Sequence, residues 1–181
     1  MAAAIPPIPD ALKKQYPNLE KFWPFIQTLN LESDRGRVLI STGFLEEQLK
    51  DILLAFFLEK PEARELVEGG FAPLGSFSAR IATSYLLGLI SEDEYHDLSL
   101  IRRIRNDFAH QIETTFQTQS VVNRCAELRK KAPNYTHHEL GAVKVDASTQ
   151  FQTVAVALIL NLINRPYHVG THRRKSEAWQ Y

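Results

Sequence analysis

The stretch FLEEQLKDILLAFF, residues 44–57, has the period that decides the fold. Its apolar residues recur at helical spacing, at Leu45, Leu49, Ile52, Leu53 and Phe56. Such spacing lines one side of an α-helix with apolar side chains, and that side is buried against other elements. No proline lies between Ser33 and Lys60, while Ser33 before the stretch and Pro61 after it are typical boundary residues. We therefore expect one long amphipathic helix in this part of the chain.

Outside this helix, the sequence predicts further helices separated by short connectors. They are expected near Pro24, over 61–70, over 76–88, from Ser91 through a capping box with Glu94, over about 120–131, and over 147–164. The connector 132–146 is compatible with a small hairpin or with no regular structure. No set of alternating β-branched runs lines up into a sheet, so the fold class is all-α, a helical bundle of about six to eight helices.

Length and composition point to one globular unit. The chain has 181 residues, 44% of them apolar and 23% charged, and its formal net charge is zero. We divide it into N-terminal short helices (1–32), a helical core (33–165) and a C-terminal tail (166–181). The balanced charge argues against a dedicated nucleic-acid binder, although local basic patches remain compatible with it.

Cysteine content and apolar runs bear on the expected location. Cys125 is the single cysteine, which excludes an intrachain disulfide and favours a cytosolic protein with a buried, inert thiol. The most apolar run, residues 154–163, is too short to span a membrane and contains Asn161. The first residues lack a basic segment, and prolines interrupt them, so we expect no signal peptide.

The stretch IRRIRNDFAH, residues 101–110, places polar groups that are costly to bury among apolar ones. On a helix, Ile101, Ile104 and Phe108 share one inward face. Asn106 and His110 are four residues apart and lie on a neighbouring polar face, which Arg103 joins. Arg105 lies close to the apolar edge, where its stem can be buried while the guanidinium reaches a carboxylate.

Two interpretations of this stretch stay open. In the structural one, Arg105 pairs with Glu46 or Glu47 on the long helix, and His110 interacts favourably with the helix C-terminus. In the chemical one, the stretch is a metal-independent ribonuclease site. There, Arg105 stabilises phosphoryl charge, His110 is the general acid or base, and Asn106 orients them.

The chemical interpretation meets a geometric obstacle. Arg105 and His110 are five residues apart, so they diverge by roughly 140° on a regular helix. They would converge if the helix ended near Ala109, or if two chains faced each other and pooled their residues.

Other stretches predict little chemistry. The adjacent His137 and His138 lack a second cluster at ligand spacing, so a solvated loop is favoured over a metal site. The basic stretch 171–175 is typical of a solubilising tail, and Trp179 and Tyr181 are aromatic anchors that could dock on another subunit. We find no phosphate-binding glycine loop and no nucleophile elbow, and we expect no cofactor and no metal.

At this point two stretches, residues 44–57 and GSFSARIATSYLLGLISEDEYHDLSLIRRIRNDFAH at 75–110, resemble the mannitol operon repressor family. The resemblance covers roughly residues 30–165. It implies an all-helical bacterial protein associated with repression of sugar-alcohol uptake and use. Members of that family lack an obvious DNA-reading motif, which implies action through a protein partner and leaves direct DNA binding open.

The same block is similar to the HEPN superfamily, whose helical domains are often dimeric. HEPN proteins that cut RNA carry an arginine, a polar residue directly after it and a histidine a few positions on, a pattern that falls here on Arg105, Asn106 and His110. This short motif implies architecture more strongly than activity. The expectation is therefore a regulatory protein, with a protein partner and a homodimer; the alternative is a HEPN-type endoribonuclease or toxin that binds RNA.

Overall fold

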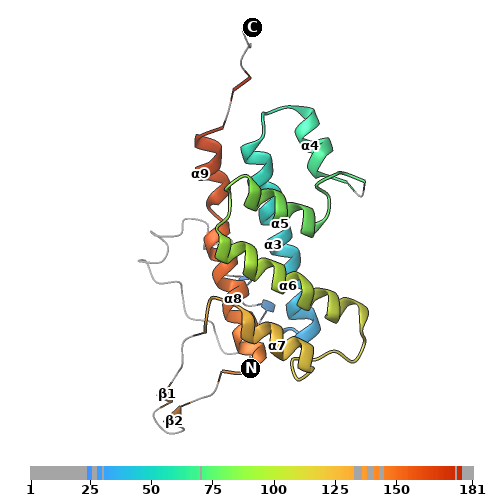
Figure 1. The fold of residues 1–181 in the computed structure, drawn as a ribbon, viewed down its shortest axis with the longest axis vertical. Coiled ribbons are helices and arrows are strands. Elements are labelled where there is room, and N and C mark those ends of the chain that lie inside the picture. Colours follow the sequence, from blue (N-terminus) through green and yellow to red (C-terminus); the bar gives the residue numbers. More distant parts are fainter. Residues whose placement is uncertain are drawn as a thin grey trace.

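The computed structural model describes residues 24–25, 28–29, 31–69, 71–132, 136–137, 141–142, 145–173 and 175–176. Its helices are α3 (Asp34–Phe56), α4 (Pro61–Val67), α5 (Phe77–Leu86), α6 (Glu92–His110), α7 (Gln119–Glu127), α8 (Ala147–Leu162) and α9 (Arg165–Thr171). Two short strands, β1 (Thr136–His137) and β2 (Gly141–Ala142), pair in antiparallel fashion. The described residues thus form a helical bundle, and the predicted all-α class is confirmed (Figure 1).

The long helix α3 is the centre of the bundle. Its N-cap is Ser33, whose hydroxyl accepts a hydrogen bond from the Gly36 amide at 3.1 Å. The expected apolar stripe is buried at Leu45, Leu49, Ile52 and Leu53, whereas its last member, Phe56, is half-buried. Helices α5, α6, α8 and α9 all pack against α3, which confirms that residues 44–57 organise the fold (Figure 1).

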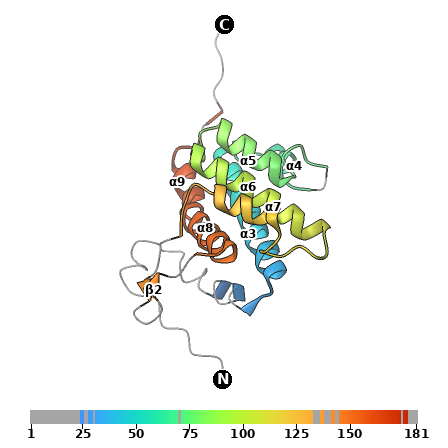
Figure 2. The same ribbon diagram turned by 60° about the horizontal axis from the view of Figure 1, so that its bottom comes forward.

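Helices α5 and α6 follow one another through a tight turn. Ser76 caps α5, as expected, and Gly88 adopts a φ of 70° in the turn, a conformation that favours glycine. Ser91 and Glu94 then form the predicted capping box at the start of α6. As a result, α6 lies between α5 and α7 with one side against the bundle (Figures 1 and 2).

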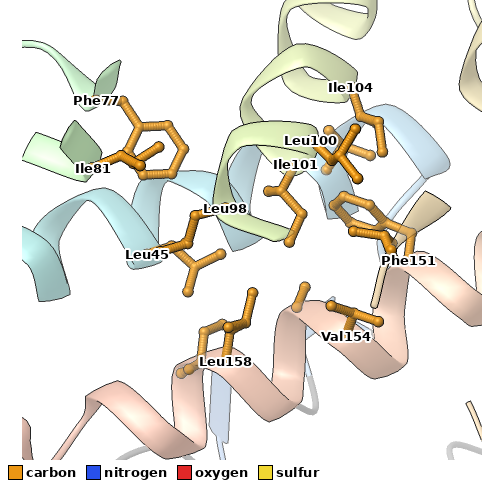
Figure 3. Close-up of a cluster of buried hydrophobic side chains, with 14 of the residues drawn as sticks. Leu45, Phe77, Ile81, Leu98, Leu100, Ile101, Ile104, Phe151, Val154 and Leu158 are labelled. Atoms are coloured by element: carbon orange, nitrogen blue, oxygen red, sulfur yellow. The ribbon is translucent and has the colours of Figure 1, made fainter. Parts of the chain in front are cut away.

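The core is shared by α3, α5, α6 and α8, as Figure 3 shows. Ile101, Ile104 and Phe108 of α6 are fully buried, so the predicted inward face is confirmed. The Phe108 ring lies 5.2 Å from the Phe116 ring, which lies 5.5 Å from that of Phe151 on α8. Burying each such aromatic side chain contributes about 1.5–3 kcal/mol, so the inner side of α6 is held firmly in place.

Helix α7 is shorter than the sequence predicts, since it ends at Glu127 rather than near residue 131. The cause is the buried carboxylate of Asp97 on α6. It accepts hydrogen bonds from the backbone amides of Arg129 at 2.7 Å and Lys130 at 3.2 Å, which pulls the chain out of the helix. A long-range acceptor therefore replaces the intrahelical one.

The end of the bundle also differs from the expected tail. Pro166 was expected to stop α8, yet it lies in the first turn of α9, where its missing amide costs nothing. After α9, Arg173 donates to the carbonyl oxygens of Ala55 at 2.9 Å and Leu54 at 3.0 Å. Residues 165–173 thus belong to the bundle, whereas the tail aromatics at 179 and 181 lie outside the described residues.

Two smaller expectations can be compared with the structure. Cys125 is buried as expected, and burial together with the nearby charge of Asp146 raises the pKa of its thiol to about 12. His137 lies in β1, while His138 is outside the described residues. Among the described helices, none has the length and apolarity needed to cross a membrane.

Candidate functional site

The candidate functional surface is the side of α6 that faces away from the core. We call it the outer face of α6; its residues are Tyr95, Ser99, Arg102, Arg103, Asn106 and His110. The helical period places these residues opposite Ile101, Ile104 and Phe108, which anchor the inner side. Core packing of the inner side thus positions the helix, and the outer face is presented on a preformed backbone.

The structure brings Arg105 and Asn106 together but leaves His110 apart from Arg105. One Arg105 guanidinium NH group donates to Asn106 Oδ1 at 3.2 Å, and both side chains are half-buried. Helix α6 continues through His110, so it does not end near Ala109 in the way that would let the two residues converge. On one chain, Arg105 and the exposed His110 therefore point in different directions.

The two acids expected to pair with Arg105 have other partners. Glu46 Oε1 lies 3.6 Å from a guanidinium nitrogen of Arg80, and Glu47 forms an ion pair with Lys50 one turn further along α3. The structure therefore brings neither acid to Arg105.

Arg80 was not expected from the sequence to have a special role, yet it is the most buried of the described arginines. It is buried on α5 and donates to the carbonyl oxygens of Leu74 at 3.0 Å, Val67 at 3.0 Å and Glu46 at 3.3 Å. These bonds join α3, the end of α4 and the start of α5. One sequence signal could have revealed it, because Arg80 lies between the apolar positions Phe77 and Ile81 of its helix.

A second contact that the sequence did not predict joins the first turn of α6 to the first turn of α9. Both oxygens of Glu94 accept from Arg165, at 2.6 and 2.9 Å, and Arg165 also donates to the Leu89 carbonyl oxygen. Burial alone would raise the pKa of Glu94, but the hydrogen bonds from Arg165 and Ser91 outweigh it and lower that pKa. The capping motif identified Glu94, whereas no local pattern marks Arg165.

Further acids near the outer face are already paired. Asp107 forms an ion pair with Arg124 of α7 and accepts from Ser120 at 3.3 Å. Arg129 bonds to Asp93 at 2.6 Å and Glu92 at 3.1 Å, and these hydrogen bonds raise the pKa of its guanidinium. These carboxylates thus already form ion pairs within the bundle.

An exposed apolar strip borders the outer face. The Tyr85 ring of α5 stacks on that of Tyr95, with centroids 4.4 Å apart and planes at 22°. A pocket of about 370 Å³ opens beside these rings and is lined also by His96, Arg103, Glu127 and Arg129. Next along the chain, Leu86 is 81% exposed and Leu87 is 37% exposed. The surface therefore combines guanidinium groups with apolar contact area.

The fold and this surface define an all-helical bundle protein that presents an arginine-bearing helix to its surroundings. No protein-family model matches the chain, and no curated protein matches its sequence. Among solved structures, a chain in the X-ray structure of the MtlR–HPr complex from Escherichia coli has a similar fold. The match has a TM-score of 0.53 at 20% sequence identity and covers 80% of this chain and 94% of that chain. The described chain therefore has an MtlR-like fold.

Proposed function

We propose that the protein is a transcriptional regulator of the mannitol-operon-repressor type that acts through a protein partner. The observation that carries the proposal is the likeness of fold, which spans nearly all of a chain from the MtlR–HPr complex. Two stretches resemble the repressor family in sequence: residues 44–57, which cover the second half of α3, and residues 75–110, which contain α5 and α6. The sequence resemblance and the likeness of fold thus both support a repressor of this type.

The geometry supports action through a partner. A preformed surface lowers the entropic cost of association, since its backbone does not have to be ordered on binding. The outer face of α6 has this property, because Ile101, Ile104 and Phe108 hold the opposite side in the core. The exposed Leu86 and Leu87 beside it add apolar area of the kind that partners bury.

A binding measurement and a transcript measurement test the proposal together. Purified full-length protein is titrated calorimetrically with HPr from the source organism and from Escherichia coli. We expect a saturable complex with at least one HPr, and we expect deletion of the gene to raise the level of mannitol-uptake transcripts. A chain that binds neither HPr, and whose deletion leaves those transcripts unchanged, is not such a regulator.

The ribonuclease alternative stays a prediction. It needs Arg105 and His110 at one reacting phosphate, and α6 places them on different sides of a single chain. Incubation of the protein with RNA in the presence of a chelator tests it directly. Cleavage that Arg105→Ala and His110→Ala both abolish, with circular dichroism unchanged, would establish the nuclease and replace the regulator as the leading function.

A further inference from the structure

The described arginines fall into two groups by what their guanidinium groups contact. Most donate to a backbone carbonyl or pair with a carboxylate: Arg35, Arg37, Arg64, Arg80, Arg124, Arg129, Arg165 and Arg173. Among the described contacts, Arg102 and Arg103 have no acceptor, and Arg105 has only the Asn106 side chain. The described arginines whose guanidinium groups contact neither a backbone carbonyl nor a carboxylate therefore all lie on α6.

None of the described acids forms an ion pair with Arg102, Arg103 or Arg105. Glu92 and Asp93 are held by Arg129, and Asp107 is held by Arg124. Glu92 and Glu127 both line the pocket beside Arg103, and Glu127 forms no ion pair among the described residues. Arg102 and Arg105 are three residues apart on α6, so their like charges repel one another and the free chain gains no stability from this pair. An acidic binding partner would turn this repulsion into attraction.

We propose that the outer face of α6, together with Tyr85, Leu86 and Leu87, is the docking surface for a protein partner that presents acidic side chains around an apolar contact. Arginine and tyrosine are the residues most enriched at the energetic centre of protein interfaces. The pocket beside Arg103 is large enough to receive a carboxylate side chain. Exposed Leu86 supplies the apolar contact next to it.

Two other occupants fit the surface less well. Single-stranded nucleic acid needs free aromatic faces for stacking, whereas Tyr85 and Tyr95 stack on each other and exposed leucines border them. A second copy of the chain, docked on the same face about a two-fold axis, would set arginines against arginines. A protein with an acidic surface around an apolar contact would pair with the arginines and also cover the exposed leucines.

Site-directed photocrosslinking in cells of the source organism tests where the partner docks. p-Benzoylphenylalanine replaces Leu86 in the full-length chain, and a control chain carries it in place of Tyr167, which is 74% exposed on α9. We expect one protein with an acidic surface to be crosslinked from position 86 and not from position 167. A crosslink only to a second copy, only to nucleic acid or to nothing overturns the proposal.

The crosslinked protein is then purified and titrated with charge-reversed variants. Arg102→Glu with Arg103→Glu should weaken binding by about tenfold or more, and raised salt should weaken binding of the unaltered chain. The matched control is Lys60→Glu with Arg64→Glu, two exposed positions near and on α4 that leave the outer face intact. Equal affinity of both double variants, with circular dichroism unchanged, overturns the proposal.

This inference shares with the proposed function only the need for a protein partner. If the crosslinked acidic protein is not HPr and HPr itself does not bind, the HPr-type mechanism fails while the docking surface stands. If HPr binds equally to the unaltered chain and to the Arg102→Glu, Arg103→Glu variant, the proposed function stands and the docking surface is rejected.

Discussion

Arg80 and Arg103 are the same residue type on neighbouring helices, yet their surroundings are opposite. Arg80 is 6% exposed and its guanidinium is surrounded by three carbonyl oxygens and the Glu46 carboxylate. Arg103 is exposed, lines an open pocket and contacts no described acceptor. The contrast separates arginines whose guanidinium groups have acceptors inside the bundle from arginines whose guanidinium groups contact no described acceptor.

The physical reason is the cost of burying charge. A guanidinium removed from water must recover its hydrogen bonds inside the protein, so a buried arginine is found with acceptors already in place. An exposed one keeps its bonds to water and needs no protein acceptor. The α3–α5 junction and the outer face of α6 should therefore respond differently to the loss of a guanidinium.

The largest effect is expected at the junction. Arg80→Met keeps the apolar stem but leaves the carbonyl oxygens of Leu74 and Val67 without this donor. It also removes the partner of the Glu46 carboxylate. Each buried acceptor left unsatisfied costs about 1–3 kcal/mol, so we expect the free energy of unfolding to fall by about 3 kcal/mol or more. Chemical denaturation followed by circular dichroism measures it. A loss below about 1 kcal/mol would mean that water replaces the guanidinium freely there.

A somewhat smaller effect is expected where α6 meets α9. Arg165→Met leaves the mostly buried carboxylate of Glu94 without its bidentate partner. Removing one member of such a pair costs about 3–5 kcal/mol when both are fully buried, and about 2–3 kcal/mol is expected here because Arg165 is partly exposed. In a double-mutant cycle, adding Glu94→Gln should recover part of the loss. Strictly additive losses would show that the two side chains do not interact.

The same pair predicts a pH dependence. The pKa of Glu94 is lower in the folded chain than its ordinary value of 4.5, so folding favours the ionised form. Its stabilising contribution is complete above that ordinary value and is lost as the pH falls through the lowered folded pKa. The free energy of unfolding should therefore drop more steeply below pH 4.5 in the unaltered chain than in Glu94→Gln. Equal slopes in parallel denaturant titrations would contradict this coupling.

The parts of the fold that the sequence predicted are those governed by local rules. Leu45, Leu49 and Ile52 mark the buried side of α3 because helical period and burial are directly linked. The capping box at Ser91 and Glu94 marks the start of α6 because its two hydrogen bonds span only three residues. Such features lie within one or two helical turns, where sequence distance and spatial distance agree.

The parts that escaped prediction depend on residues far apart in the chain. Helix α7 ends early because Asp97 accepts amides that lie more than thirty positions away. Arg173 was assigned to a tail, yet it binds carbonyl oxygens at the end of α3. For the candidate site, the sequence placed Arg105 at the apolar edge of its helix and Asn106 on the polar face with His110. The acceptor of each arginine could not be predicted, because it depends on how α3, α5 and α6 pack.

An intermediate effect is expected for Arg105, which stands between the two groups. Its guanidinium has one neutral acceptor, Asn106 Oδ1, and its side chain is half-buried. One such hydrogen bond contributes about 0.5–1.5 kcal/mol, so Arg105→Met should lower the free energy of unfolding by that amount. A loss as large as that of Arg80→Met would place Arg105 in the scaffold and would favour the structural interpretation of the 101–110 stretch.

The smallest effect is expected for Arg102→Met with Arg103→Met. Neither guanidinium has an acceptor to lose in the described contacts, and removing the Arg102 charge relieves its repulsion with Arg105 three residues further on. Surface changes of this kind usually alter the free energy of unfolding by less than about 0.5 kcal/mol in either direction. The denaturation midpoint should therefore match that of the unaltered chain. A clear loss of stability would show that these two arginines support the fold. The difference between arginines with acceptors inside the bundle and arginines available to a partner would then no longer explain their presence on α6.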